Sequence, residues 1–319
     1  MSSRALAASV SNQLDGWKYQ ALLAVLPFHH LAGFATVLNT LYLGAEVCLA
    51  GDMKYFYRYL KVMKPDYVSV VPSMLQVLAR RVKNGGDNGK LLGWDLHYVN
   101  CGGAAFYPEL LQIFLDRNIE VFQGYGASEA GGIGFLCKMD PAKPDTIGKP
   151  PRGLAVKIAD HELLLKSESL MMGYYDDKES TEEVLSDGWY RTGDLCYCDE
   201  EGYIYLTGRK KNLIILSNGE NVSPEEIETK LHACKEICEI VVEERQDQIA
   251  AVIFPDFPAQ SNDKEKEEIR MRIRKAVEEY NQKAPLYKQV HKVLFRREPF
   301  GKTAGGKIIR QKIEGGDIS

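Results

Sequence analysis

The sequence lacks the features that would place the protein in a membrane, outside the cell or on nucleic acid. No run of about 18 or more apolar residues occurs, and the opening stretch MSSRALAASVSNQLDG lacks the charged start, apolar segment and cleavage site of a secretion signal. The 40 Lys and Arg residues are outnumbered by 44 Asp and Glu, which gives a formal net charge of −4. The basic excess that nucleic acid binding requires is therefore missing. We expect a soluble, cytoplasmic protein with no transmembrane segment and no nucleic acid partner.

Cysteine is too sparse and too scattered for a disulfide framework. The chain has 7 cysteines among 319 residues, and an odd number spread over this length favours reduced thiols. Cys196 and Cys198 form one close pair and Cys234 and Cys238 another, but no third and fourth ligand stands at zinc-site spacing. We expect these thiols to pack as small hydrophobic side chains rather than to bind metal.

Apolar runs and helical spacing alternate in the first 139 residues. Residues 22–27 and 67–71 are short apolar runs typical of buried strands, and residues 73–82 follow with helical spacing. Strand followed by helix, repeated, predicts a parallel sheet. From residue 140 to 208, short alternating segments with Gly and Asp turns predict an antiparallel sheet or small barrel.

The last part of the chain predicts a separate α+β unit. Ser223-Pro224-Glu225-Glu226 combines a capping residue, proline at the first helical position and glutamate three residues after the cap, so we expect a capping box. Residues 238–242 and 249–254 predict a hairpin, and residues 264–283 place apolar side chains on one helical face. The expected organisation is a large domain over 1–208, divided into 1–139 and 140–208, and a small C-terminal domain over 209–319.

Two familiar nucleotide-binding motifs are incomplete in this sequence. The phosphate-loop pattern would need glycine where Arg296 stands before Gly301-Lys302-Thr303, and a dinucleotide fingerprint starting at Gly124 meets Glu129 in place of its third glycine. The second failure is informative, because a carboxylate one turn beyond a tight Gly-Tyr-Gly is suited to a hard cation such as Mg²⁺ beside a phosphate. The tyrosine face is available to stack on a base.

This segment, Gln123-Gly124-Tyr125-Gly126-Ala127-Ser128-Glu129, resembles the Q-G-Y-G-x-[ST]-E motif of the adenylate-forming superfamily, which includes acyl-CoA synthetases, luciferase and adenylation domains. Further motifs follow the family's order along nearly the whole chain. They are LPFHH at 26–30, GGA at 102–104, DGWYRTGD at 187–194, GRKK at 208–211, SNGENVSPEEIE at 217–228 and TAGGK at 303–307. Within the superfamily, residues 211–221 are most similar to long-chain fatty acyl-CoA ligases. The resemblance implies a parallel-sheet subdomain, a small antiparallel subdomain and a mobile C-terminal domain.

The resemblance implies which residues of these motifs bind the nucleotide and the other cofactors. Asp194 would accept hydrogen bonds from both ribose hydroxyls of ATP, which suits a carboxylate facing a cis-diol. Arg209 would assist at the ribose and phosphate end, and Tyr125 would stack on adenine, with burial in a core as its competing interpretation. The other nucleotide- or cofactor-binding positions that the resemblance implies are Gly103, Ala104, Gly126, Ser128 and Gly219.

The resemblance also assigns residues to the reacting groups. Glu129 would bind the Mg²⁺ that bridges phosphates, and Ser128 would donate its hydroxyl to a phosphate oxygen. His30 matches a histidine near the acyl carboxylate, with a core histidine as the alternative, and His29 beside it is a second candidate for the same place. Lys307 would be the mobile catalytic lysine, bridging the acid and the α-phosphate as charge develops. Lys211 occupies the family's hinge position, and Gly219 belongs to the loop that lines the pantetheine channel.

The resemblance implies an AMP-forming ligase that uses ATP and Mg²⁺ to join a carboxylic acid to CoA and releases AMP. The acid is expected to be a fatty acid, which would place the enzyme in fatty acid metabolism. One family element does not occur in these residues, the Ser/Thr/Gly-rich phosphate loop that ends in Pro-Lys-Gly. Loss of one preorganised donor costs roughly 10² to 10³ in rate, and this loop supplies several. The second hypothesis is therefore a truncated, non-catalytic nucleotide- or acyl-CoA-binding module, or half of a split ligase completed by an N-terminal partner chain. A homo-oligomer is a further expectation.

Overall fold

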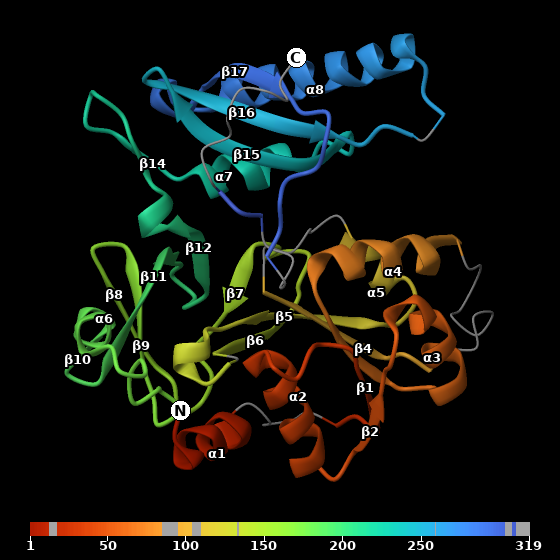
Figure 1. Cartoon of the computed structure of the whole chain (residues 1–319), viewed down its shortest axis with the longest axis vertical. Coiled ribbons are helices and arrows are strands. Elements are labelled where there is room, and N and C mark those ends of the chain that lie inside the picture. The colour runs from red at the N-terminus through yellow and green to blue at the C-terminus, as the bar shows by residue number, and fades with distance from the viewer. Residues whose placement is uncertain are drawn as a thin grey trace. The chain divides into compact units, whose positions relative to one another are not determined.

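The computed structural model describes residues 1–12, 18–84, 95–103, 110–132, 134–258, 260–303 and 308–310. The chain divides into two compact units, Met1–Leu206 and Thr207–Ser319, and each is described by itself (Figure 1). Among the described residues, no helix combines the length and the apolar character that crossing a membrane requires.

The first unit is built on a mixed sheet in the strand order β2-β1-β3-β4-β5-β6. The pairs from β2 to β5 are parallel and β6 runs antiparallel to β5. The residues of β1 and β3 are buried throughout, as expected of strands that are covered on both faces. The strands are β1 (Ala21–Ala24), β2 (Glu46–Leu49), β3 (Tyr67–Val70), β4 (Tyr98–Gly102), β5 (Glu120–Tyr125) and β6 (Phe135–Lys138).

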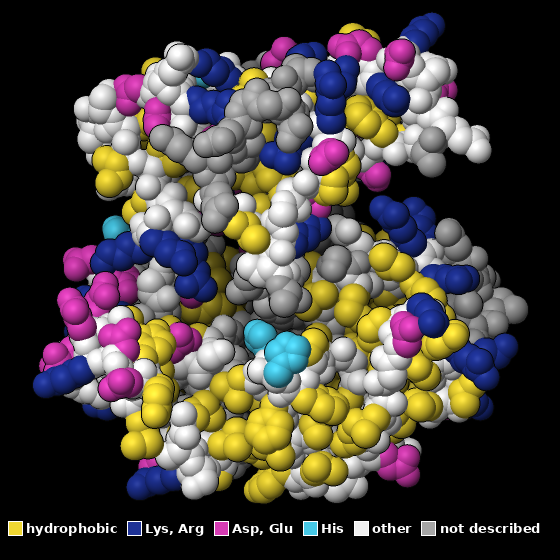
Figure 2. Space-filling model, viewed as in Figure 1, with side chains coloured by type: hydrophobic (Ala, Val, Ile, Leu, Met, Phe, Trp, Pro, Cys, Tyr) yellow, Lys and Arg dark blue, Asp and Glu magenta, His cyan; other side chains and the backbone are white. Residues whose placement is uncertain are grey.

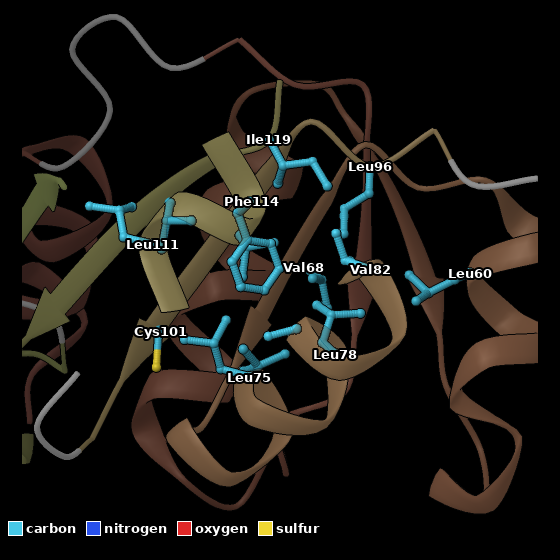
Figure 3. Close-up of a cluster of buried hydrophobic side chains, with 14 of the residues drawn as sticks. Leu60, Val68, Leu75, Leu78, Val82, Leu96, Cys101, Leu111, Phe114 and Ile119 are labelled. Carbon is cyan, nitrogen blue, oxygen red and sulfur yellow. The ribbon is translucent and has the colours of Figure 1, made fainter. Parts of the chain in front are cut away.

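Helices cover both faces of this sheet. On one face α3, α4 and α5 contribute to a core in which Leu78 and Val82 of α4 converge with Phe114 of α5 and Val68 of β3 (Figure 3). On the other face, side chains of β1 and β3 form a smaller cluster with Val37 of α2. The helices of this part are α1 (Ser3–Asn12), α2 (Leu31–Tyr42), α3 (Phe56–Met63), α4 (Pro72–Asn84) and α5 (Leu111–Leu115), with short 3₁₀ turns η1 (Met53–Tyr55) and η4 (Ser128–Ala130).

A second sheet completes the first unit, with the strand order β7-β12-β11-β9-β8 and β10 beside β11. The pairs β7–β12, β9–β11 and β8–β9 run antiparallel, so the antiparallel sheet predicted for residues 140–208 is confirmed. Its elements are β7 (Thr146–Gly148), β8 (Ala155–Ala159), β9 (Glu162–Lys166), α6 (Lys178–Val184), β10 (Leu185–Ser186), β11 (Trp189–Cys198) and β12 (Ile204–Arg209).

The second unit packs two helices against a three-stranded sheet in the order β15-β16-β17. The β15–β16 hairpin is antiparallel as predicted, and α8 connects β16 to the parallel strand β17. Helix α8 begins with a complete capping box between Asn262 and Glu265 and buries Ile269, Ile273 and Val277. The elements are η5 (Lys210–Asn212), β13 (Ile214–Ile215), β14 (Asn221–Val222), α7 (Pro224–Leu231), β15 (Ile237–Arg245), β16 (Gln248–Pro255), α8 (Asp263–Lys283), η6 (Leu286–Lys288) and β17 (Val290–Phe295).

The α/β class with parallel and antiparallel sheets is confirmed, but one local prediction is wrong. Helix α7 begins after Ser223 as predicted, yet the Ser223 side chain makes no cap hydrogen bond. Its hydroxyl donates to Glu225 Oε2 at 3.1 Å, and the Glu226 carboxylate accepts from Lys230 at 2.8 Å and from Lys288 at 2.7 Å. Nearby charged partners therefore replace the capping box.

Candidate functional site

Gly103 and Tyr125, two of the predicted nucleotide residues, lie at the carboxyl ends of two neighbouring parallel strands. Gly102 at the end of β4 is in register with Gly124 of β5, and Tyr125 is the last residue of β5. Ligands of open α/β sheets bind outside the carboxyl ends of the strands. Gly103 has φ +87°, and a Cβ placed there would meet no atom of the described residues within 4 Å.

A break in the regular pairing of β9 and β11 determines where Asp194 lies. The register shifts between Arg191 and Leu195, and Gly193 has φ +69°. Thr192 Oγ1 donates to the Leu163 carbonyl at 2.8 Å and accepts from the Asp194 amide at 3.0 Å. Such irregularities redirect side chains next to functional sites.

A carboxylate that sequence reasoning missed secures the same turn. The Gly193 amide donates to Glu162 Oε1 at 3.2 Å, and Arg191 Nη1 lies 3.8 Å from Glu162 Oε2. The Glu162 side chain is only 5% exposed, so an unpaired charge there would be costly. Glu162 therefore supports the conformation that presents Asp194.

Tyr125 and Asp194, 69 residues apart in the sequence, are in direct contact. Tyr125 Oη donates to Asp194 Oδ2 at 2.5 Å, and Asp194 is 6% exposed. The Tyr125 ring is half-buried and lies edge-on to Phe135, with the ring centroids 5.8 Å apart. The ring is therefore held by its hydroxyl at one end and by an aromatic neighbour along its edge. It is neither enclosed in a core nor loose on the surface.

The loop that follows Tyr125 is fixed from two sides. Ser9 of α1 donates to the Gly131 carbonyl at 2.7 Å, and Ser169 donates to the Ala130 carbonyl at 2.9 Å. Gly131 has φ +91°, and a Cβ there would lie 3.0 Å from the Cβ atoms of both serines. Gly126 and Ser128 on this loop are exposed, and Glu129 is half-exposed.

Tyr174 contacts Glu129 and was not among the residues predicted from the sequence. Its hydroxyl donates to Glu129 Oε1 at 3.0 Å, and its backbone amide donates to Thr181 Oγ1 at 2.9 Å. Burial and the neighbouring Glu129 raise the pKa of Tyr174 to about 12, so it stays a donor at neutral pH. A lone tyrosine 45 residues from its partner carries no local sequence signal.

Both candidate histidines are exposed, so the alternative of a core histidine is wrong. His30 is the N-cap of α2, where its Nδ1 accepts from the Ala32 amide at 3.3 Å. Three residues further on, a Cβ at Gly33 would lie 2.5 Å from the Pro27 carbonyl oxygen. Glycine at this position therefore allows α2 to begin directly against the turn that carries His29 and His30.

The remaining predicted residues belong to the second unit or lie outside the described residues. Arg209 ends β12 and caps η5, which contains Lys211. Gly219, with φ +84°, lies in the turn between β13 and β14, where its amide donates to the Leu216 carbonyl at 2.8 Å. Ala104 and Lys307 lie outside the described residues.

Two family models match the chain in order. The family model of AMP-binding enzymes matches residues 1–175, and the model of the AMP-binding enzyme C-terminal domain matches residues 211–315. A 2-succinylbenzoate–CoA ligase from Listeria monocytogenes is 32% identical over 316 residues, covering 96% of this chain and 63% of the relative. A long-chain-fatty-acid–CoA ligase, FadD15 of Mycobacterium bovis, is 28% identical over 271 residues, covering 70% of this chain and 45% of the relative.

The fold is shared with solved structures. The O-succinylbenzoate CoA synthetase MenE of Bacillus subtilis, in complex with AMP, superposes with a TM-score of 0.77 at 22% identity, covering 98% of this chain and 64% of that one. A fatty acyl CoA synthetase of Mycobacterium tuberculosis gives a TM-score of 0.62 at 26% identity, covering 97% and 63%. The chain spans between 45% and 63% of the length of the curated relatives described above. With both family models matched in order and this fold, the chain belongs to the family of AMP-binding enzymes.

Proposed function

We propose that the chain is the catalytic part of an AMP-forming acid–thiol ligase, which activates a carboxylic acid with ATP and passes the acyl group to CoA. The observation that carries the proposal is the contact of Tyr125 with Asp194 at the carboxyl ends of the parallel strands, with Glu129 four residues further along the chain. The resemblance of residues 211–221 to long-chain ligases favours a fatty acid as the substrate. The relatives act as ligases on two kinds of acid, long-chain fatty acids and 2-succinylbenzoate.

The described residues fit the nucleoside part of ATP. Asp194 Oδ2 accepts the Tyr125 hydroxyl, and an ionised carboxylate has two oxygens that can each accept more than one hydrogen bond, as recognition of a ribose diol requires. Gly103, directly after β4, has no side chain, and among the described residues nothing lies within 4 Å of where its Cβ would be, which would let a planar base approach the backbone. Tyr125, held by Asp194 and Phe135, offers a ring whose orientation is set before the base arrives.

The described residues also fit a cation beside phosphate. Glu129 offers a half-exposed carboxylate, and the Tyr174 hydroxyl at Oε1 limits the rotation of that group. Bound Mg²⁺ would neutralise phosphate charge as it develops. Ser128, exposed on the same 3₁₀ turn, would donate its hydroxyl to a phosphate oxygen.

The reaction has two displacements that balance without a redox partner. An oxygen of the substrate carboxylate attacks the α-phosphorus, and pyrophosphate leaves. The CoA sulfur then attacks the acyl carbonyl carbon, loses its proton to solvent, and AMP leaves as a far better group than hydroxide. In this proposal Lys307 stabilises the first transition state, His30 lies near the acid, Arg209 assists at the phosphate end, and the Gly219 loop admits the CoA arm.

The decisive test separates the two displacements. Lys307→Ala should abolish acid-dependent pyrophosphate release and spare thioester formation from a preformed acyl adenylate. Lys235→Ala, at an exposed position of the second unit, is the matched control and should leave both rates unchanged. Equal loss of both displacements in the Lys307 variant, or no loss in either, would contradict the assignment.

One observation favours a second candidate, in which the chain is one part of a ligase that another polypeptide segment completes. Exposed apolar side chains accumulate on α2, β2 and α3, including Tyr42 at 67%, Leu49 at 60% and Val62 at 70% exposure. Figure 2 shows hydrophobic side chains gathered on the face that carries α2 and β2. A patch of this kind beside an edge strand is typical of a surface that another chain covers.

The proposed occupant is a polypeptide segment that pairs with β2 and supplies the Ser/Thr/Gly-rich phosphate loop. Such a segment should bind the chain and raise the rate of pyrophosphate release, and Leu49→Lys on β2 should weaken this binding. If the chain is a monodisperse monomer that turns over ATP without any addition, this second candidate is wrong.

A further inference from the structure

In the second unit, the chain beyond β17 doubles back on itself. Lys302 forms an antiparallel bridge with Ile308, and the Ile309 amide donates to the Gly301 carbonyl at 2.9 Å. These residues define a hairpin whose two arms are 300–303 and 308–310. Lys307 directly precedes the second arm in the sequence.

A buried carboxylate of β15 holds the first arm. Glu239 Oε2 accepts from the Phe300 amide at 2.7 Å, and Glu239 Oε1 lies 2.6 Å from Lys302 Nζ. The Glu239 side chain is 8% exposed, so its charge would be costly without these partners, whereas the Lys302 side chain is 42% exposed. The Phe300 ring is buried against Val241 and Val252 of the same sheet, which adds an apolar anchor to the polar one.

A second carboxylate holds the other arm. Glu228 of α7 receives both terminal nitrogens of Arg310, with Nη1 2.8 Å from Oε1 and Nη2 bonded to Oε2. Glu228 Oε1 also accepts from the Val242 amide of β15 at 2.7 Å, and its side chain is 13% exposed. A two-point guanidinium–carboxylate contact fixes direction as well as distance. Ile308 packs on the cluster that buries Phe300, so both arms lie against β15.

We propose that Glu239 of β15 and Glu228 of α7 are positioning residues that hold the arms 300–303 and 308–310 in place, and that acid activation depends on this fastening because Lys307 directly precedes the second arm in the sequence. The inference rests on the proposed function for the role of Lys307, whereas the fastening itself rests on the contacts of Lys302 and Arg310. The two carboxylates are 8% and 13% exposed and have lost most of their hydration, so each charge would be costly without the basic partner that its arm supplies.

The fastening is tested by hydrogen exchange in the whole chain. Glu239→Gln keeps the shape of the side chain and removes its charge, so exchange of the Ile309 amide, which Glu239 does not contact, should accelerate about tenfold. Glu236→Gln breaks the 2.9 Å pair with Arg272 in the same unit and is the matched control that should leave Ile309 unchanged. Unchanged exchange at Ile309 in the Glu239 variant would overturn the fastening.

The consequence for chemistry is tested by the two displacements. Lys302→Met and Glu239→Gln should each slow acid-dependent pyrophosphate release about tenfold, with thioester formation from preformed acyl adenylate unchanged, and Lys302→Arg should restore the rate because it keeps the charge. If Lys307→Ala abolishes pyrophosphate release while these variants do not slow it, the inference is wrong and the proposed function stands. If Lys307→Ala has no effect, the proposed function fails, and exchange at Ile309 still decides whether the carboxylates fasten the hairpin.

Discussion

The hydrogen bond between Tyr125 and Asp194 should stabilise the first unit measurably. Tyr125→Phe removes one hydroxyl from a 2.5 Å contact with a carboxylate that is 6% exposed. A hydrogen bond to a charged group contributes about 1.5–3 kcal/mol, so the free energy of unfolding should fall by about that amount. For a unit of this size the melting temperature should drop by about 3–12 °C.

The assay is a double-mutant cycle followed by differential scanning calorimetry. In the Asp194→Asn background the charge is gone, and Tyr125→Phe should then cost less than about 1 kcal/mol. The coupling energy of the pair should therefore be about 1–2 kcal/mol. If the effects of the two substitutions on the free energy of unfolding are additive within about 0.5 kcal/mol, Tyr125 and Asp194 are not coupled, and their hydrogen bond does not stabilise the first unit.

Three further substitutions test other contacts of the first unit. Tyr174→Phe removes the hydrogen bond to Glu129, so it should weaken Mg²⁺-dependent ATP binding about tenfold and leave AMP binding unchanged. Calorimetric titration in which both nucleotides bind as they do to the wild type would contradict this. Gly33→Ala should lower the free energy of unfolding by about 1–3 kcal/mol, because its Cβ would lie 2.5 Å from the Pro27 carbonyl oxygen, and a denaturation midpoint equal to that of the wild type would disprove the clash. Burial raises the pKa of Tyr19 from 10.0 to about 12. The fold therefore favours the neutral phenol, and its contribution of about 2–3 kcal/mol is complete below pH 10 and lost as the pH rises to 12. In Tyr19→Phe the free energy of unfolding should therefore fall less between pH 10 and pH 12 than in the wild type. An equal fall in both proteins would show that another group titrates.

Periodicity and motif order were enough to predict the layers of the fold. The buried runs at β1 and β3 and the one-sided pattern of α8 follow from burial alone, because apolar side chains must face the core whatever their distant partners are. The capping box at Ser223 failed because the prediction considered only the helix itself. Lys288, 62 residues from Glu226, takes the carboxylate that the box needed.

The residues of the candidate site were predicted from motifs, whereas the contacts that join them were not. The Tyr125 segment and Asp194 were identified, yet the contact that joins them depends on the turn at Gly193, which Glu162 supports from 31 residues away. Tyr174 reaches Glu129 across 45 residues and lies in no motif that sequence reasoning singled out. Long-range hydrogen bonds of this kind are set by the packing of two sheets, which a single sequence does not encode locally.

We propose that the carboxyl ends of β4 and β5, together with Asp194, form an adenylate site. The most direct measurement is isothermal titration of the purified chain with AMP and with ATP·Mg²⁺, repeated with Asp194→Asn, followed by pyrophosphate release with short to long fatty acids. We expect that AMP binds and that pyrophosphate release depends on the acid. Asp194→Asn should weaken AMP binding at least about tenfold, because it removes the charged acceptor proposed for the ribose. Absence of AMP binding, or AMP binding that Asp194→Asn leaves unchanged, would contradict this proposal.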